Sequence, residues 1–165
     1  MIRDLNSRDQ EGLESLFAID RMCERDLKQV VEIEEASGLN RWGYDSYKRE
    51  MLRNLTSVLL VARSMEGEPD VMGFFAGWTV EDELHVNNIA THPRYRRMGI
   101  GRTLMQAAIE IAKPCGVTCV VLEVRASNQS AQSMYRKLGF RFVARRRDYY
   151  RFPAEDAMVM KLEID

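Results

Sequence analysis

The spacing of hydrophobic residues predicts regular secondary structure from residue 16 onward. A strand is expected at 16–23, followed by a helix that Asp26 could cap and that ends near Gly38. A second helix is expected at 44–55. Three strand-like runs then follow one another with short polar turns between them, at 57–64, 70–80 and 83–92. Three such runs in succession predict an antiparallel meander.

The second half of the chain alternates between the two periods. A helix is expected at 100–113, where Pro114 and Gly116 stop it. The nearly continuous apolar run "VTCVVLEV" predicts a strand at 117–124 that is buried on both faces. A short helix at 128–138 and a hairpin made of 140–150 and 156–164 complete the chain. Strands clustered first and then alternating with helices indicate an α/β fold, with a mixed sheet covered by helices.

Composition limits the classes of protein to which the chain can belong. Its 165 residues suit one domain, which we place at 17–165, behind a charged N-terminal extension at 1–16. No apolar run approaches the roughly 18–20 residues of a membrane span, and the charged first residues hold no apolar signal core. We therefore expect a cytoplasmic protein without membrane contact. The three cysteines lie in apolar stretches without metal-ligand spacing and are expected to be small buried residues.

Charge is distributed unevenly between the two halves. Residues 1–80 carry 10 basic and 15 acidic side chains, whereas residues 81–165 carry 14 and 10. The net charges are therefore −5 and +4, although the whole chain has a net charge of only −1. A basic second half favours an anionic ligand over direct nucleic-acid binding, for which a high isoelectric point is typical.

The stretch "RYRRMGIGRTLM" at 94–105 predicts a site for a phosphate group. The first N–H groups of the helix that begins near Ile100 have no acceptor within that helix and carry the positive end of its dipole. Gly99 and Gly101 lack a Cβ, so a ligand oxygen can approach the main chain. Guanidinium groups that can reach a phosphate come from Arg96, Arg97 and Arg102. A glycine-containing helix start with solvated arginines remains the alternative.

Two well-known phosphate motifs do not fit this stretch. A P-loop ending at Gly101 would need glycine at Arg96 and lysine at Arg102. A dinucleotide-binding fingerprint would need its third glycine at Leu104. The ligand is therefore of another class.

"RRMGIG" at 96–101 resembles the acetyl-CoA signature Arg/Gln-x-x-Gly-x-Gly/Ala of the GNAT acetyltransferases and matches it at every fixed position. The resemblance covers roughly 17–164. Within the family it is strongest to the ribosomal-protein-alanine N-acetyltransferases, through "LEVRASNQSAQSMYRKLGF" at 122–140 and "RRRDYY…EDAMVM" at 146–160. It implies the GNAT fold, in which a mostly antiparallel sheet splays between two strands.

The resemblance also implies how acetyl-CoA is bound, without a metal. The pyrophosphate would lie on the segment Arg96–Arg102, which includes Met98 and Ile100. Main-chain groups of Ile89, Ala90 and Thr91 would pair with the pantetheine arm as an added strand does. Asn128 can cap the short helix by its side chain, and the family uses the matching asparagine to bind CoA.

Glu123 is the candidate general base. It interrupts an apolar strand, where a carboxylate is costly unless it has a partner or a task. Alternation places it on the same face as Arg125, so an ion pair between these two residues is the structural alternative. The family resemblance favours the base, acting directly or through a water molecule.

Tyr135 is the candidate general acid. Its position on the inward face of the helix at 128–138 is also that of an ordinary core tyrosine. In the family, the matching tyrosine lies beside the CoA sulfur and protonates it. The 12 residues from Glu123 to Tyr135 can bring both side chains to one cleft.

The acceptor side is less defined by the sequence. Aromatic residues that could line a groove for a peptide N-terminus are Trp42, Tyr44, Tyr149 and Tyr150, although an ordinary aromatic core or surface fits them equally well. Glu155 and Asp156 could attract the incoming amine or could lie in a solvated turn.

We expect an acetyl-CoA-dependent enzyme that acetylates the α-amine of a protein N-terminus by direct transfer. The resemblance points to an alanine-type N-terminus of a ribosomal protein. The alternatives are acetylation of a lysine or of a polyamine, and a CoA-sensing module without turnover.

Overall fold

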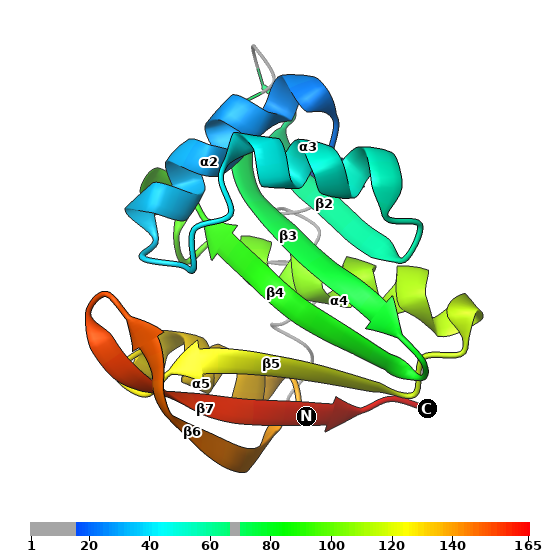
Figure 1. Cartoon of the computed structure of the whole chain (residues 1–165). Coiled ribbons are helices and arrows are strands. Elements are labelled where there is room, and N and C mark those ends of the chain that lie inside the picture. Colours follow the sequence, from blue (N-terminus) through cyan, green and yellow to red (C-terminus); the bar gives the residue numbers. More distant parts are fainter. Residues whose placement is uncertain (1–15, 67–69) are drawn as a thin grey trace, which may run out of the picture.

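The computed structural model describes residues 16–66 and 70–165 of the chain (Figure 1). Residues 1–15, most of the predicted extension, lie outside the described part. The strands are β1 (Phe17–Arg21), β2 (Ser57–Ser64), β3 (Val71–Val80), β4 (Glu83–Thr91), β5 (Cys119–Arg125), β6 (Arg141–Arg151) and β7 (Ala154–Glu163). The helices are α2 (Leu27–Ala36), α3 (Tyr44–Arg53), α4 (Ile100–Ala112) and α5 (Gln129–Lys137), with short 3-10 turns at Glu24–Asp26, Pro93–Tyr95 and Lys113–Cys115.

The strands of the described part form one sheet in the order β1-β2-β3-β4-β5-β7-β6. All neighbours are antiparallel except β4 and β5, which are parallel and are joined through α4. The predicted meander corresponds to β2, β3 and β4, and the predicted hairpin corresponds to β6 and β7. The expected mixed, mostly antiparallel α/β fold is confirmed.

β4 and β5 separate halfway along their length, which is the expected splay. Their pairing runs from Glu83 opposite Cys119 to Val86 opposite Leu122 and then stops. At the next residue, Asn87, the register of β4 against β3 shifts, because Gly77 pairs with Val86 and Ala76 pairs with Asn88. A bulge of this kind bends its strand. The remaining residues of β4 therefore diverge from the end of β5, and Figure 1 shows the gap between the two ribbons.

Helices cover the two faces of the sheet unequally. The α2–α3 pair packs on one face of the β1–β4 half, around Ile33, Tyr47 and Phe74. Helices α4 and α5 pack on the other face, where the larger core includes Phe75, Leu104 and Tyr135. In Figure 1 no helix lies in front of β5, β7 and β6. In the described part of the chain, no helix therefore covers the sheet beyond the splay on the face that α2 and α3 cover elsewhere.

Gly73 on β3 allows α4 and β4 to lie close together. A Cβ built at this position would be 2.8 Å from Cγ2 of Ile100 and 2.9 Å from the carbonyl oxygen of Ala90. Real Cβ atoms do not come so near to main chain. The glycine thus sets how tightly the start of α4 packs against the end of β4.

Three expectations about individual residues were wrong. Asp26 precedes α2 but makes no side-chain cap, because its carboxylate pairs with Arg63 at 2.6 Å. β5 is not buried on both faces, since Val121, Glu123 and Arg125 are half-buried and alternate with buried neighbours. Only Cys119 is fully buried, whereas Cys23 is half-buried and Cys115 is exposed.

Candidate active site

The segment before α4 has the backbone of an anion-binding turn. Arg97 and Gly99 have positive φ angles of 63° and 77°, and α4 begins at the next residue, Ile100. Left-handed residues beside extended or helical ones turn successive N–H groups toward one side. The first N–H groups of the 13-residue helix α4 add to this set. The main chain at 97–102 can therefore hold a pyrophosphate.

The side chains around this turn fall into two groups, apolar ones that pack inward and arginines that are exposed. Met98 and Ile100 pack inward against the core, so only their main chain is available to a ligand. Arg96, Arg97 and Arg102 are exposed and can supply positive charge. A Cβ at Gly101 would lie 3.3 Å from Sδ of Met134 and 3.8 Å from Oγ1 of Thr91. The turn thus lies where α4, α5 and the end of β4 meet.

The end of β4 presents one free edge to the gap. Ile89, Ala90 and Thr91 pair with β3 on one side, whereas β5 no longer pairs with them on the other. The side-chain Nδ2 of Asn87, at the bulge, is buried without a hydrogen-bond acceptor in the described part of the protein. Unused polar groups along this edge fit an extended ligand with amide groups of its own, such as pantetheine.

Asn128 caps α5 as predicted. Its Oδ1 accepts a hydrogen bond from the main-chain N–H of Ala131 at 3.1 Å. The cap begins α5 directly after the end of β5. That the Nδ2 group of Asn128 binds CoA remains a prediction.

Glu123 lies on β5 immediately beyond the last residue paired with β4, so it is placed at the mouth of the gap. Its side chain is 21% exposed, and Oε1 lies 3.2 Å from Nη1 of Arg146. The alternative ion pair with Arg125 is absent among the described contacts, because Arg125 pairs with Glu155 instead. Glu123 is therefore reachable by solvent and by an acceptor.

Tyr135 belongs to α5, and its side chain lies in the core between α5 and the sheet, on the face of β5 opposite to Glu123. Its side chain is 5% exposed, and its ring lies 5.6 Å from that of Phe140. Burial, with a smaller effect of Tyr150, raises the pKa of Tyr135 well above the usual 10. No hydrogen bond joins its hydroxyl to another described residue. The hydroxyl therefore keeps its proton at neutral pH and has no competing partner.

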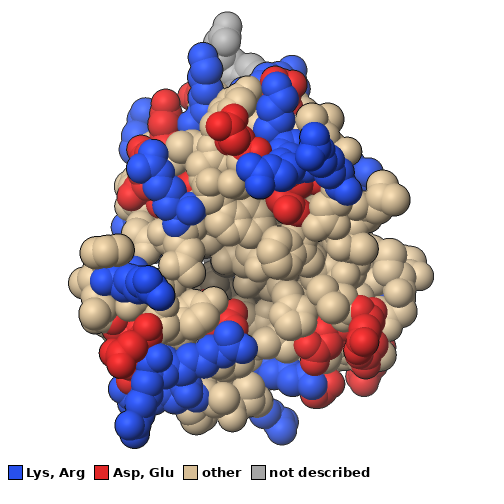
Figure 2. Space-filling view, in the orientation of Figure 1, with Lys and Arg blue, Asp and Glu red and all other residues tan. Residues whose placement is uncertain are grey.

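A pocket of about 390 Å³ lies between the α2–α3 loop and the β6–β7 turn. Its wall consists of Leu39, Asn40, Arg41, Arg125, Tyr149, Arg151 and Phe152. In Figure 2 the surface is hollowed between the upper and the lower part of the molecule, and basic side chains gather below the hollow. We call this space the acceptor pocket, because it opens on the uncovered face of β5 that carries Glu123.

The four predicted acceptor-side aromatic residues lie in different places. Tyr149 lines the acceptor pocket. Tyr150 is buried beneath Arg125, whose guanidinium lies 4.1 Å from its ring centre. Trp42 stacks on Trp78 at 5.5 Å, and the Tyr44 hydroxyl donates to Glu24 at 3.3 Å. Of the four, the structure brings only Tyr149 into the wall of this pocket.

Glu34 on α2 is a buried residue, missed by sequence reasoning, that holds the loop from which one wall of the acceptor pocket is made. It is 1% exposed, and its carboxylate accepts hydrogen bonds from the N–H groups of Trp42 at 2.8 Å and Gly43 at 3.0 Å. It also accepts from the Tyr47 hydroxyl at 2.8 Å and from Asn88 Nδ2 at 3.1 Å. Glu34 thus ties the α2–α3 loop to β4. Its position four residues after Val30, on the apolar face of the helix, is the signal that could have revealed it.

Glu155 and Asp156 are also engaged rather than free. Glu155 pairs with Arg125 at 3.3 Å and accepts from the main-chain N–H of Ser127. Asp156 pairs with Arg145 at 2.6 Å and accepts from the N–H of Asp148 at 2.9 Å. Both residues lie in β7 instead of a solvated turn, and both carboxylates hold the hairpin together.

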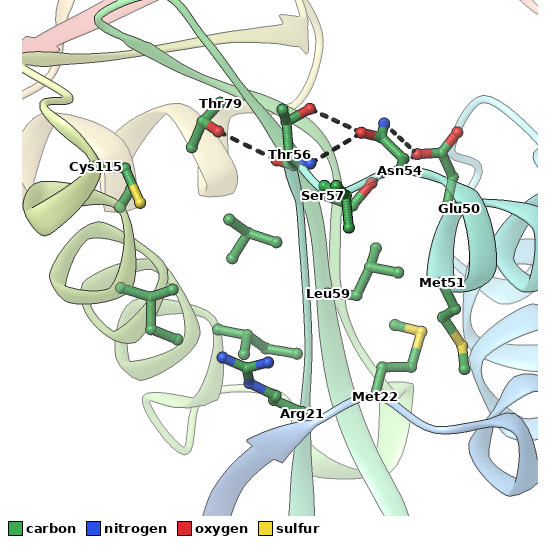
Figure 3. A pocket seen from close by; sticks show the side chains of 15 residues that line it. Arg21, Met22, Glu50, Met51, Asn54, Thr56, Ser57, Leu59, Thr79 and Cys115 are labelled. Carbon is green, nitrogen blue, oxygen red and sulfur yellow. Dashed lines mark hydrogen bonds between the residues drawn. The ribbon is translucent and has the colours of Figure 1, made fainter.

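A second pocket of about 390 Å³ lies at the other end of the sheet, between α3, β2 and the end of α4 (Figure 3). Its polar wall is already hydrogen-bonded, since Thr79 donates to Thr56, Thr56 to Asn54 and Asn54 to Glu50. None of the candidate catalytic residues lines it. It is therefore separate from the candidate site.

The described residues lack two further features. They contain no group of three or more His, Cys, Asp or Glu side chains arranged to hold a metal ion. None of their helices is long and apolar enough to cross a membrane.

Comparison with known proteins agrees with this geometry. Residues 20–140 match the acetyltransferase (GNAT) family. A protein of Bacillus subtilis (strain 168) is 35% identical over 148 residues, which is 90% of this chain and 96% of that protein. The ribosomal protein bS18-alanine N-acetyltransferase of Haemophilus ducreyi (strain 35000HP) is 31% identical over 87% of this chain and 98% of its own length.

A solved structure leads to the same family. The crystal structure of the ribosomal-protein-S18-alanine N-acetyltransferase from Escherichia coli superposes with a TM-score of 0.78 at 30% identity. The match covers 91% of this chain and 95% of that one. Together with the family match over most of the sheet, these relationships show that the chain belongs to the GNAT family of acetyltransferases, acyltransferases that depend on acetyl-CoA.

Proposed function

We propose that this enzyme acetylates the α-amine of an N-terminal alanine on a ribosomal protein of the bS18 type. The relatives from Haemophilus ducreyi and Escherichia coli are named for this reaction and align over nearly their whole length. The observation that carries the proposal is the acceptor pocket, which is walled by two loops and by Arg125, two residues after Glu123 on β5. A pocket open to solvent at this place suits the end of a peptide chain. A cytoplasmic location suits an acceptor of this class.

The donor end of the site is assigned to the turn and the free edge of β4. The N–H groups at 97–102 and the exposed arginines would bind the pyrophosphate, and Ile89–Thr91 would hold the pantetheine arm. Acetyl-CoA supplies the activated thioester. The splay would let that thioester pass through the sheet to the face that carries Glu123.

Glu123 is assigned the role of general base. An N-terminal α-amine has a pKa of about 8, so at neutral pH most acceptor molecules must lose a proton before they attack. A carboxylate at the mouth of the gap can accept that proton directly or through one water molecule. Its 21% exposure then allows the proton to leave to solvent.

Tyr135 is assigned the role of general acid. Its raised pKa keeps the hydroxyl protonated at the pH of catalysis. The sulfur of the departing CoA needs one proton, and a buried hydroxyl without a protein acceptor can donate it. The acid and the base then lie on opposite sides of β5.

A panel of acceptors tests the proposed function. Peptides would begin with free alanine, with N-acetylated alanine followed by an internal lysine, or with a different first residue, and a polyamine would be added as a fourth acceptor. After incubation with acetyl-CoA, mass spectrometry should find one acetyl group on the α-amine of the free alanine peptide. Preferred acetylation of the lysine or of the polyamine would overturn the assignment. CoA binding without any product would indicate a sensing module.

A further inference from the structure

One guanidinium group bonds to both walls of the acceptor pocket. Nη1 of Arg125 donates to the carbonyl oxygen of Pro153 at 3.1 Å, and Nη2 donates to that of Phe152 at 3.1 Å. Nε donates to the carbonyl oxygen of Gly38 at 3.4 Å. The first two acceptors belong to the β6–β7 turn, and the third belongs to the α2–α3 loop. Arg125 therefore joins two loops that are more than 100 residues apart in the chain.

The orientation of this guanidinium is itself fixed. Nη1 pairs with Oε2 of Glu155 at 3.3 Å, while the other oxygen of Glu155 accepts from the N–H of Ser127. One face of the guanidinium lies 4.1 Å from the ring centre of Tyr150. With 17% of its side chain exposed, Arg125 has little freedom to move. A lysine has neither the planar fork nor the stacking face needed to reproduce these contacts.

We propose that Arg125 is a positioning residue that sets the separation of the two walls of the acceptor pocket, and thereby the affinity for the acceptor. The inference rests on the proposed function, because it takes this pocket as the place where the acceptor binds. Leu39, Asn40 and Arg41 form one wall, directly after Gly38. Phe152 in the other wall offers its own carbonyl to the same guanidinium. Loss of the bridge frees both walls while the turn before α4, at the other end of the gap, keeps its contacts.

The consequence is a separation of kinetic effects between the two substrates. A displacement of about 1 Å in a positioning element can cost on the order of 10²-fold in efficiency. In Arg125→Lys the KM for the acceptor peptide should therefore rise by about tenfold or more. The KM for acetyl-CoA should stay within about twofold, because no hydrogen bond or ion pair among the described residues joins Arg125 to the segment 96–102. An arginine that only stabilised the fold would change neither KM selectively.

Arg63→Lys is the matched control. The Arg63 guanidinium is also held in place by acidic partners, Asp26 at 2.6 Å and Asp20 at 3.1 Å, and only 10% of its side chain is exposed. It lies on β2 near the opposite edge of the sheet, away from both ends of the gap. This variant should lose stability without a selective change in the acceptor KM. A melting temperature and a titration with CoA show whether each variant is folded.

The experiment measures KM for acceptor and donor, and kcat, in the parent enzyme, Arg125→Lys and Arg63→Lys. Glu155→Gln is a milder second variant, which keeps Arg125 but removes its ion pair, and it should raise the acceptor KM in the same direction. If Arg125→Lys does not fold, the kinetics of Glu155→Gln test the proposal instead. The proposal is overturned if the acceptor KM is unchanged, if both KM values rise together, or if Arg63→Lys has the same effect. Failure of the proposed function is seen separately, as a parent enzyme that prefers a lysine or a polyamine.

Discussion

Glu123 is paired with Arg146 on β6, 3.2 Å from Oε1 to Nη1, and not with the arginine two residues further along its own strand. Arg146 is 57% exposed and lies 5.6 Å from the ring centre of Tyr149. The partner of the candidate base is thus an exposed side chain next to Tyr149 of the acceptor pocket, whereas Arg125 is held by Glu155. Glu123 and Arg125 lie two residues apart on the same face of β5 but pair with different side chains. The roles of the base and of the positioning residue can therefore be tested separately.

Glu123→Gln should lower turnover on the order of 10²–10⁴-fold while CoA binding is retained. The loss should become smaller as the pH rises above about 8, because the α-amine is then already neutral. Rates measured from pH 6 to pH 9.5 with an alanine peptide test this dependence. A loss that is equal at every pH would contradict the base role.

Arg146→Met distinguishes the base from a structural partner. It removes the ion pair but keeps the carboxylate, so it should reduce turnover far less than Glu123→Gln. Because Arg146 is 57% exposed, loss of the pair should change the free energy of unfolding by less than about 1 kcal/mol. Equal losses of turnover in the two variants would show that only the pair matters.

Tyr135→Phe should lower kcat by about tenfold or more at an almost unchanged melting temperature. The ring and its contact with Phe140 remain, and the hydroxyl has no hydrogen-bond partner among the described residues to lose. The loss should be smaller than in Glu123→Gln and should shrink with an acyl donor whose thiol is more acidic. Full activity with acetyl-CoA would leave Tyr135 as a core residue.

The pH profile of the parent enzyme gives a second test of Tyr135. Burial raises its pKa above 10, so the acid form is lost only as the pH rises through that higher value. Turnover of the parent should therefore show no alkaline decline caused by this group below about pH 10. A decline near pH 8 that disappears in Tyr135→Phe would be incompatible with this assignment.

Local patterns were sufficient for most of the fold. The run "SVLLVARS" predicted β2 with the bounds that the structure gives, because a short apolar run between turns has few alternatives. Asn128 was predicted as a cap for the same reason, since the N–H group from which its side chain accepts lies three residues away. The splay came from the family resemblance, and the bulge at Asn87 now supplies its physical cause.

Contacts between distant segments were beyond the reach of such patterns. Arg125 has Glu155 as its partner, 30 residues later, and no spacing rule selects that carboxylate over Glu123. Asp26 was taken for a cap because its partner, Arg63, lies 37 residues further along. The expectation that β5 is buried on both faces failed because, among the described residues, helices cover only one face of the sheet beyond the splay. Burial there depends on the arrangement of helices and not on the strand's own residues.

Gly99→Ala should raise the KM for acetyl-CoA, and Gly116→Ala should not. Both glycines have positive φ angles, 77° and 86°, and a Cβ at either would meet no atom within 4 Å. Each alanine should therefore cost about 1–2 kcal/mol of stability through left-handed strain. Only Gly99 lies at the start of α4, where the main chain would contact pyrophosphate. Equal KM values in the two variants would place the phosphate site elsewhere.

Glu34→Gln should lower the free energy of unfolding by about 1–3 kcal/mol. The carboxylate accepts four hydrogen bonds from groups that can all donate. The amide NH₂ of glutamine would face at least one of these donors and leave it unsatisfied in a buried place. Glu35→Gln is the control, because the adjacent Glu35 is 49% exposed and pairs with Arg41 on the surface, so its change should stay within about 0.5 kcal/mol. Urea unfolding of both variants measures the difference, and equal stabilities would show that the Glu34 network does not hold the loop.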